Sequence, residues 1–206
     1  MTPQPPTPPS TPSSDTRTTA DDAPRAALAD AVREIEHHVA AAGWDAPVRV
    51  FALVRTQAAL AAEPGLADQL TPETLAAARE HAWHLTSVEQ EGLPPAPDLE
   101  TLLAGLSWPA TVDGVAVTVE RVVLPPEAEE AMPADLPTGP DQDPDAAVQW
   151  LLAHPDRQDV RLAVGVLRDG PAWCAVRTRA HDADDQVGQG GDVVPGLVAA
   201  LRATLE

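Results

Sequence analysis

The sequence lacks lysine, asparagine and tyrosine, and it contains one cysteine, one isoleucine and one phenylalanine: Cys174, Ile35 and Phe51. A single cysteine excludes an intramolecular disulfide. No apolar run approaches the roughly 18 residues that span a bilayer. The N-terminus also lacks the charged start and apolar stretch of a secretory signal. These absences predict a cytoplasmic protein without a membrane span.

Because lysine is absent, all 13 basic residues are arginines, and they face 32 acidic residues, for a net charge of −19. The abundance of alanine, proline, arginine and aspartate is typical of a GC-rich genome, so arginine clusters carry less functional information than usual. A charge of this sign repels phosphate backbones and anionic lipid. We therefore expect no nucleic acid and no membrane partner.

The common enzyme signatures are also missing: there is no Gly-x-Ser-x-Gly elbow, no phosphate-binding loop with its lysine and no dinucleotide fingerprint. Cys174 lies within a β-patterned run, where thiols are usually inert small hydrophobes. Gly188, Gly190 and Gly191 precede a helical pattern, but Asp192 places a negative charge where a phosphate would bind. We expect no cofactor and assign no catalytic residue.

Composition divides the chain into a tail and one domain. Residues 1–22 are rich in proline, serine and threonine without apolar periodicity, which predicts a disordered tail. Residues 23–206 are long enough for a single hydrophobic core. Within them, residues 125–144 combine six prolines with acids, and this predicts an irregular loop.

Residues 157–180, RQDVRLAVGVLRDGPAWCAVRTRA, carry the clearest local pattern. Two runs alternate with a period of two on either side of Asp169-Gly170, a dipeptide that fits a tight primed turn. Both faces of the runs are apolar. The pattern predicts a β-hairpin near the centre of a sheet.

The remaining elements follow from periodicity and capping. A helix begins at Asp21 or Asp22, with Pro24 in its first turn, and stops at Gly43. Strands are predicted at 48–55 and 115–124, helices at 57–70, 72–85, 98–106 and 194–205, a further helix capped by Asp143, and a polar loop at 86–97. This order predicts an α+β fold: a mainly antiparallel sheet with helices packed on one face, including a C-terminal amphipathic helix.

Several segments together resemble a known family: AAGW followed by VFALVRT, then SVEQEGLP, VERVVLPPEAE, RQDVRLAVGVLRDG, WCAVRTR and DVVPGLVAALRATL. In this combination the chain resembles an uncharacterised protein family of actinobacteria, over roughly residues 26–206. The resemblance agrees with the GC-rich, cytoplasmic interpretation. It implies no activity and no site residues, because none is assigned to that family.

Arginines on the predicted strands give the leading functional hypothesis. Four of them share faces with Phe51, Leu53 or Trp173, so aligned strands would form an arginine and aromatic surface suited to an acidic peptide. The alternative is pairing of these arginines with local acids. The hypothesis predicts a protein- or peptide-binding adaptor protein, and its candidate binding residues are Arg49, Arg55, Arg161, Arg177, Arg179 and Trp173.

A metal-dependent, hydrolase-like enzyme is the alternative hypothesis. The segment HDADD follows the second hairpin strand, where a bend would gather its side chains around a cation. Its candidate ligands are His181, Asp182, Asp184 and Asp185. A zinc site from His37, His38, His81 and His84, with Glu34 or Glu80, requires two helices to pack together, and the spacing does not establish that.

Overall fold

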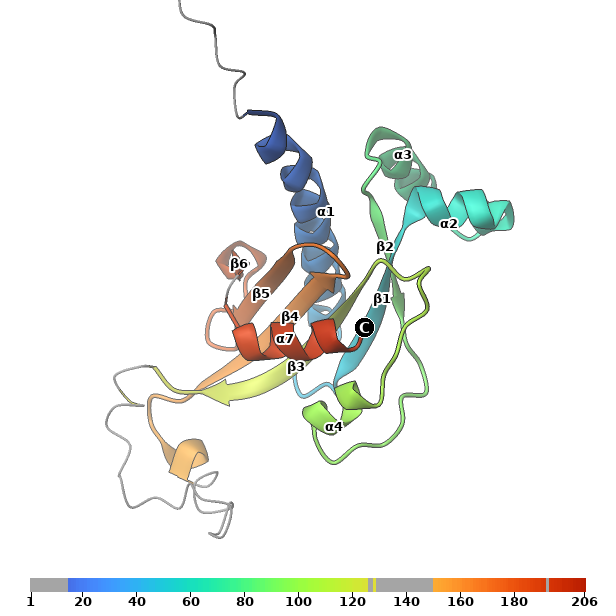
Figure 1. Ribbon diagram of the computed structural model, residues 1–206. Coiled ribbons are helices and arrows are strands. Elements are labelled where there is room, and N and C mark those ends of the chain that lie inside the picture. Colours follow the sequence, from blue (N-terminus) through green and yellow to red (C-terminus); the bar gives the residue numbers. More distant parts are fainter. Residues whose placement is uncertain (1–14, 126–127, 129–149, 192) are drawn as a thin grey trace, which may run out of the picture.

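The computed structural model describes residues 15–125, 128, 150–191 and 193–206. Its centre is a six-stranded antiparallel sheet with the strand order β2-β1-β3-β4-β5-β6. The strands are β1 (Arg49–Arg55), β2 (Leu85–Glu89), β3 (Gly114–Val123), β4 (Gln158–Leu167), β5 (Ala172–Thr178) and β6 (Gly188–Gly190). Figure 1 shows the long β3 and β4 in the middle of this sheet. The predicted hairpin is thus confirmed as part of the sheet centre.

The helices are α1 (Asp15–Ala40), α2 (Thr56–Ala62), α3 (Pro72–Glu80), α4 (Leu99–Ala104) and α7 (Pro195–Ala203), with short 3-10 turns η1 (Pro64–Asp68) and η2 (Asp184–Gln186). Both α3 and α4 have an N-terminal cap. The Thr71 hydroxyl accepts a hydrogen bond from the Thr74 N–H, and the Asp98 carboxylate accepts one from the Thr101 N–H. None of the helices in the described part of the chain is long and apolar enough to cross a membrane.

The helices cover both faces of the sheet (Figure 1). On one face, the α1 stripe of Leu28, Val32, Ile35 and Val39 packs on small residues of β3, β4 and β5. Gly165 allows the closest approach, because a Cβ atom there would lie 2.6 Å from a Val32 methyl group. On the other face, α4 and α7 pack on branched residues, among them Val115, Val117, Val164 and Val166.

This arrangement confirms the predicted α+β class, the antiparallel sheet and the C-terminal helix. The prediction placed the helices on one face, however, and the structure divides them between two. The physical reason is that β3 and β4 are apolar on both faces, so each face requires a cover.

The strand β2 begins at Leu85, the last residue of the predicted helix 72–85, and continues into the segment that was predicted to be a polar loop. It has few apolar residues because it is an edge strand: Leu85 is buried beneath α1, while Val88 is 49% exposed. The glycines at 188 and 190 likewise belong to an edge strand, β6, which pairs with β5. Edge strands bury little side-chain area, so hydrophobic alternation marks them weakly.

Two further predictions differ from the structure. The helix α1 begins at Asp15, so Pro24 lies inside it, and the predicted tail overlaps its first residues. The turn after β4 is longer than two residues, since the Leu167 N–H bonds to the Pro171 carbonyl and Gly170 does not have a positive φ. The predicted loop at 126–144, with Asp143, lies outside the described residues, as do residues 1–14.

Candidate functional site

The strand arginines do share one face of the sheet, as the alternation predicted. Arg161 of β4 lies directly opposite Arg177 of β5 in the register. On β1, Arg49 and Arg55 have the same parity as Phe51, which contacts the α1 core. The helix α1 covers this face, however. The predicted surface is therefore partly an interior, and its arginines have separate environments.

Arg177 is the centre of a buried ion-pair network. It is 2% exposed, as is Glu36 of α1, and the two form a bidentate pair: Nε lies 2.7 Å from Oε1 and Nη2 lies 2.8 Å from Oε2. The same guanidinium donates to the Asp182 carbonyl at 2.9 Å and to Asp184 Oδ1 at 2.7 Å. A fork of this kind fixes the position of α1 on the sheet.

Arg161 is 1% exposed and extends the network toward the end of α1. Its Nη2 lies 2.9 Å from Glu120 Oε1 and also donates to the Gly43 carbonyl. Nη1 has no hydrogen-bond partner among the described residues and lies 4.0 Å from Glu36 Oε1. The Trp44 ring stacks against it, at 4.4 Å from the guanidinium carbon to the ring centroid.

The loop after α1 is shaped to place this tryptophan. Gly43 and Asp45 both have positive φ values, 86° and 66°, a conformation that glycine and aspartate tolerate. The Asp45 N–H donates to Glu120 at 2.8 Å, and its carboxylate accepts from Arg179 at 2.6 Å. Arg179 covers Trp44 from 5.0 Å. The helix α1 ends at Ala40, and the turn at the predicted stop, Gly43, follows it. This turn places Trp44 and Asp45 on the outer side of the network.

Two pKa values in the network shift toward the charged form. The hydrogen bond that Arg177 donates to Glu36 raises the pKa of the Arg177 guanidinium, although burial opposes this shift. The hydrogen bond from Arg177 is the main cause that lowers the pKa of the exposed Asp184 carboxyl. Because α1 buries both of them, Arg161 and Arg177 cannot serve as a docking surface while α1 is in place. This corrects the sheet-face hypothesis for these two residues.

The acids proposed as metal ligands surround Arg177 instead. Asp182 and Asp184 both contact its guanidinium, and His181 Nδ1 lies 3.4 Å from the Thr178 hydroxyl. Asp185 is exposed in η2. Across the described ranges, no three histidine, cysteine or acidic side chains are grouped as metal ligands. The carboxylates of Asp182 and Asp184 pair with Arg177, so their negative charge is already balanced by a guanidinium.

The four helix histidines also have separate neighbours. His37 lies 3.4 Å from Asp184 and His38 lies 3.9 Å from Glu89, whereas His84 contacts the Thr56 hydroxyl at 2.8 Å. His81 lines a groove beside α1. They therefore do not form the zinc site that was considered.

The other two candidate binding residues make local contacts. Arg49 Nε lies 3.7 Å from Glu89 Oε1 across the β1–β2 pair. The Trp173 indole donates to the Gln189 side chain at 3.3 Å. Neither lines the pocket described next.

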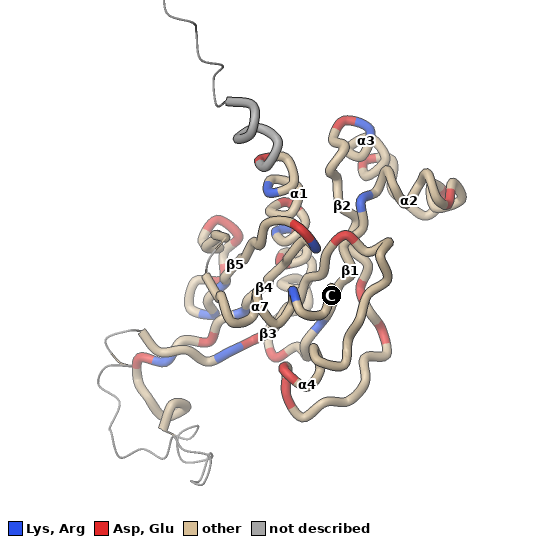
Figure 2. The backbone as a smooth tube through the Cα atoms, in the orientation of Figure 1, with Lys and Arg blue, Asp and Glu red and all other residues tan. Residues whose placement is uncertain are grey.

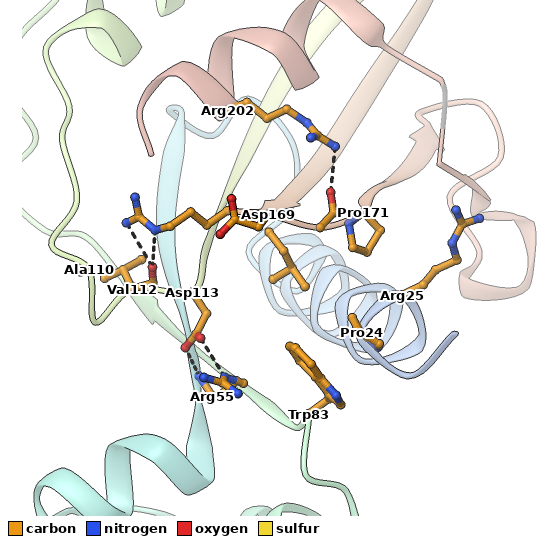
Figure 3. Close-up of a pocket in the computed structure, with 13 residues that line it drawn as sticks. Pro24, Arg25, Arg55, Trp83, Ala110, Val112, Asp113, Asp169, Pro171 and Arg202 are labelled. Atoms are coloured by element: carbon orange, nitrogen blue, oxygen red, sulfur yellow. Dashed lines mark hydrogen bonds and ion pairs between the residues drawn. The ribbon is translucent and has the colours of Figure 1, made fainter. Parts of the chain in front are cut away.

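A pocket of about 640 Å³ opens at the opposite end of the strands, where Arg55 is found (Figure 3). Its walls come from the first turns described in α1, the end of β1, the turn between β4 and β5, and the end of α7. Four of the 13 arginines of the chain line it, but only two of the 32 acids do. The lining residues are Pro24, Arg25, Arg55, Trp83, Ala110, Val112, Asp113, Leu167, Arg168, Asp169, Gly170, Pro171 and Arg202.

Arg55 is held at the pocket wall by Asp113. Asp113 Oδ2 accepts from the Arg55 backbone N–H at 2.7 Å, and Oδ1 accepts from Nε at 2.8 Å. The guanidinium carbon lies 5.1 Å from the centroid of the Trp83 ring, which is itself 37% exposed. The guanidinium therefore stays fixed with part of its hydrogen-bonding capacity open, since its side chain is 41% exposed.

The other arginines differ in how firmly they are held. Arg168 donates to four backbone carbonyls, those of Trp108, Pro109, Val112 and Leu205, which ties the loop before β3 to the C-terminal residues. Arg202 makes one bond, to the Gly170 carbonyl at 3.0 Å. Arg25 is exposed and has no ion pair with any described residue. Figure 3 shows Arg25, Arg55 and Arg202 standing around the pocket.

The model of the PPA1309-like protein family matches residues 28–206. The chain belongs to this family. Comparisons with curated proteins and with solved structures each returned no match.

The family match covers both the network and most of the pocket. It starts at Leu28, so Pro24 and Arg25 are the only pocket residues that precede it. Of these pocket arginines, sequence reasoning named only Arg55, because it considered strands and not the turns beyond them. The turn sequence Arg168-Asp169-Gly170 could have pointed to Arg168, because it places an arginine at the end of the hairpin. No local pattern pointed to Arg25, Arg202 or Trp83, which the fold brings together.

Figure 2 shows why charge clusters were difficult to interpret from the sequence. Basic and acidic segments alternate over the described tube, including neighbouring ones in the turn between β4 and β5. Most such residues form ion pairs with neighbours of opposite charge, and Arg161, Arg177 and Arg179 all do so. The pocket differs because its arginines outnumber its acids.

Proposed function

We propose that this protein is a cytoplasmic binding protein of actinobacterial origin. It holds an acidic segment of a partner protein in the pocket lined by Arg25, Arg55, Arg168 and Arg202, called the arginine pocket below. The observation that carries the proposal is the lining of four arginines and two aspartates in a chain with a net charge of −19. Such a local excess of cations attracts carboxylates that the rest of the surface repels.

The four arginines of the pocket have two different roles in this proposal. Arg55 and Arg168 are fixed by Asp113 and by backbone carbonyls, so they shape a positive floor. Arg25 and Arg202 retain unused N–H donors and are exposed, so they are the residues that close on a carboxylate with paired hydrogen bonds. Trp83 and Pro171 supply apolar walls for the peptide's methylene groups.

The first test is fluorescence polarisation with a labelled tetraglutamate peptide at low salt. The variant Arg25→Glu with Arg202→Glu reverses both exposed charges, and we expect the dissociation constant to rise at least about tenfold. The control Arg33→Glu with Arg79→Glu makes the same change of net charge outside the pocket, and it should raise the constant much less. Equal losses for the two pairs would show a nonspecific charge effect and would reject the pocket.

A further inference from the structure

The free edge of β2 is a second surface, independent of the arginine pocket. In the β1–β2 ladder, the Gln90 N–H bonds to the Val50 carbonyl and the Thr56 N–H bonds to the His84 carbonyl. The even-numbered residues of β2 therefore face β1, and the N–H and carbonyl groups of Leu85, Ser87 and Glu89 face outward. No described strand pairs with this edge.

The edge has little of the usual protection. Its five residues, LTSVE, contain no proline and one charged residue, Glu89 at the end of the strand, and Val88 is 49% exposed. The opposite edge of the sheet, β6, has only three residues, GQG. Proteins normally shorten, charge or cover edges that must not pair. By this criterion β6 is protected and β2 is available.

A groove of about 400 Å³ runs beside the β2 edge. It is lined by three consecutive strand residues, Leu85, Thr86 and Ser87, whose side chains point to alternate faces. The pocket must therefore follow the strand edge rather than one face. Its other walls are Glu34 of α1 and the region around the start of α3, namely Gln69, Leu70, Thr71, Glu73, Thr74 and Ala77.

A groove between an edge strand and a helix is the geometry in which extended peptides bind by adding a strand. The backbone groups of the edge provide affinity, and the groove walls select side chains. The open space beside β2 thus has both parts of such a site.

Charge selects the occupant. The lining contains Glu34 and Glu73 and no arginine. A second copy of this chain would bring another net charge of −19 against the same acids, so the groove disfavours self-association. A basic strand has the complementary sign.

We propose that an extended, basic segment of a partner protein binds along β2 as a seventh strand, with its basic side chains toward Glu34 and Glu73. This site is separate from the arginine pocket, and it takes a ligand of opposite charge. The proposal for the β2 edge can therefore be rejected without affecting the proposal for the arginine pocket, and the reverse also holds.

The probe is the amidated peptide Thr-Arg-Val-Arg-Val-Arg-Thr, titrated by isothermal calorimetry. Its matched control is the same sequence with an N-methyl group on every residue, which keeps every charge but blocks pairing through either edge of the peptide. We expect at least about tenfold weaker binding of the methylated peptide, because several backbone hydrogen bonds are lost. Equal binding of the two peptides would overturn the proposal, since charge alone would then explain the interaction.

The protein side is tested with Ser87→Pro, which removes the central outward N–H, and with Gln189→Pro on β6 as the control edge. Only Ser87→Pro should weaken binding, again about tenfold. If that variant does not fold, amide hydrogen exchange on the wild-type protein decides: the peptide must protect Leu85, Ser87 and Glu89. Unchanged exchange there, or protection already present in a self-associated form without peptide, would reject the seventh-strand model.

Discussion

At one end of the strands under α1, Arg161 and Arg177 are buried and each contacts a carboxylate within 2.9 Å. At the other end, some six residues along β4, Arg25 and Arg202 are exposed around a pocket. The residue type is the same at both ends. What differs is α1, which supplies Glu36 at the first end, whereas its described residues at the second end are Pro24 and Arg25.

The comparison shows that an arginine in this protein is structural or available according to the acids that the fold places beside it. Burial strengthens the difference, because a buried guanidinium without a carboxylate is costly. An exposed guanidinium without a carboxylate costs little free energy, because water solvates it, and it is available to bind a ligand. Three changes to the chain test this distinction.

The largest effect is expected from Glu36→Gln, which removes the carboxylate shared by Arg177 and, more distantly, Arg161. Breaking a buried ion pair leaves an uncompensated charge, so the free energy of unfolding should fall by roughly 3–5 kcal/mol. Urea denaturation measures it. The control is Glu34→Gln on the exposed side of the same helix, which should change stability by less than about 0.5 kcal/mol.

A small loss for Glu36→Gln, comparable to that of its control, would mean that the buried network contributes little. The double variant Arg161→Ala with Arg177→Ala is expected to be severely destabilised for the same reason. A folded double variant would contradict the structural role.

An intermediate effect is expected from Arg55→Gln at the pocket. The pair with Asp113 is partly exposed, with 41% and 22% side-chain exposure, so solvent screens it. We expect a loss of about 1 kcal/mol in thermal or chemical unfolding. Arg25→Gln, which removes a pocket arginine without an ion pair, should stay within about 0.5 kcal/mol. A loss for Arg55→Gln as large as that for Glu36→Gln would abolish the contrast between the two ends.

The smallest effect concerns pH and Asp184 at the exposed rim of the network. Its pKa is lowered, chiefly by the hydrogen bond from Arg177. A lowered folded-state pKa gives stability that is present above the unfolded value of about 3.9 and is lost as the pH falls through the folded value. The stability difference between the wild type and Asp184→Asn should therefore shrink between pH 5 and pH 3.

Urea midpoints of the two proteins at pH 5, 4 and 3 measure this difference. Asp185→Asn serves as the control, because no contact of the Asp185 carboxylate with Arg177 is present among the described residues. A difference that stays constant over this range would show that Asp184 does not stabilise the network through its charge.

Much of the fold was predictable because its central strands and caps carry local signals. Strong alternation identified β1, β3, β4 and β5, and Thr71 and Asp98 marked two helix starts. The edge strands were missed because Val88 and Gly190 bury little, so no alternation is required there. The position of α1 on the opposite face from α7 was also missed, because an apolar stripe shows which side of a helix is buried but not which face of the sheet it packs on.

The sequence by itself determined the acidic charge, the single cysteine, the central hairpin and which arginines lie on the same face within each strand. These follow from composition and from the two-residue period of a strand. Only the tertiary structure decided that Glu36 meets Arg177 across 141 positions, and that Arg25, Arg55, Arg168 and Arg202 surround one pocket. Contacts of that separation depend on how helices dock on the sheet, and the local pattern of residues does not encode it.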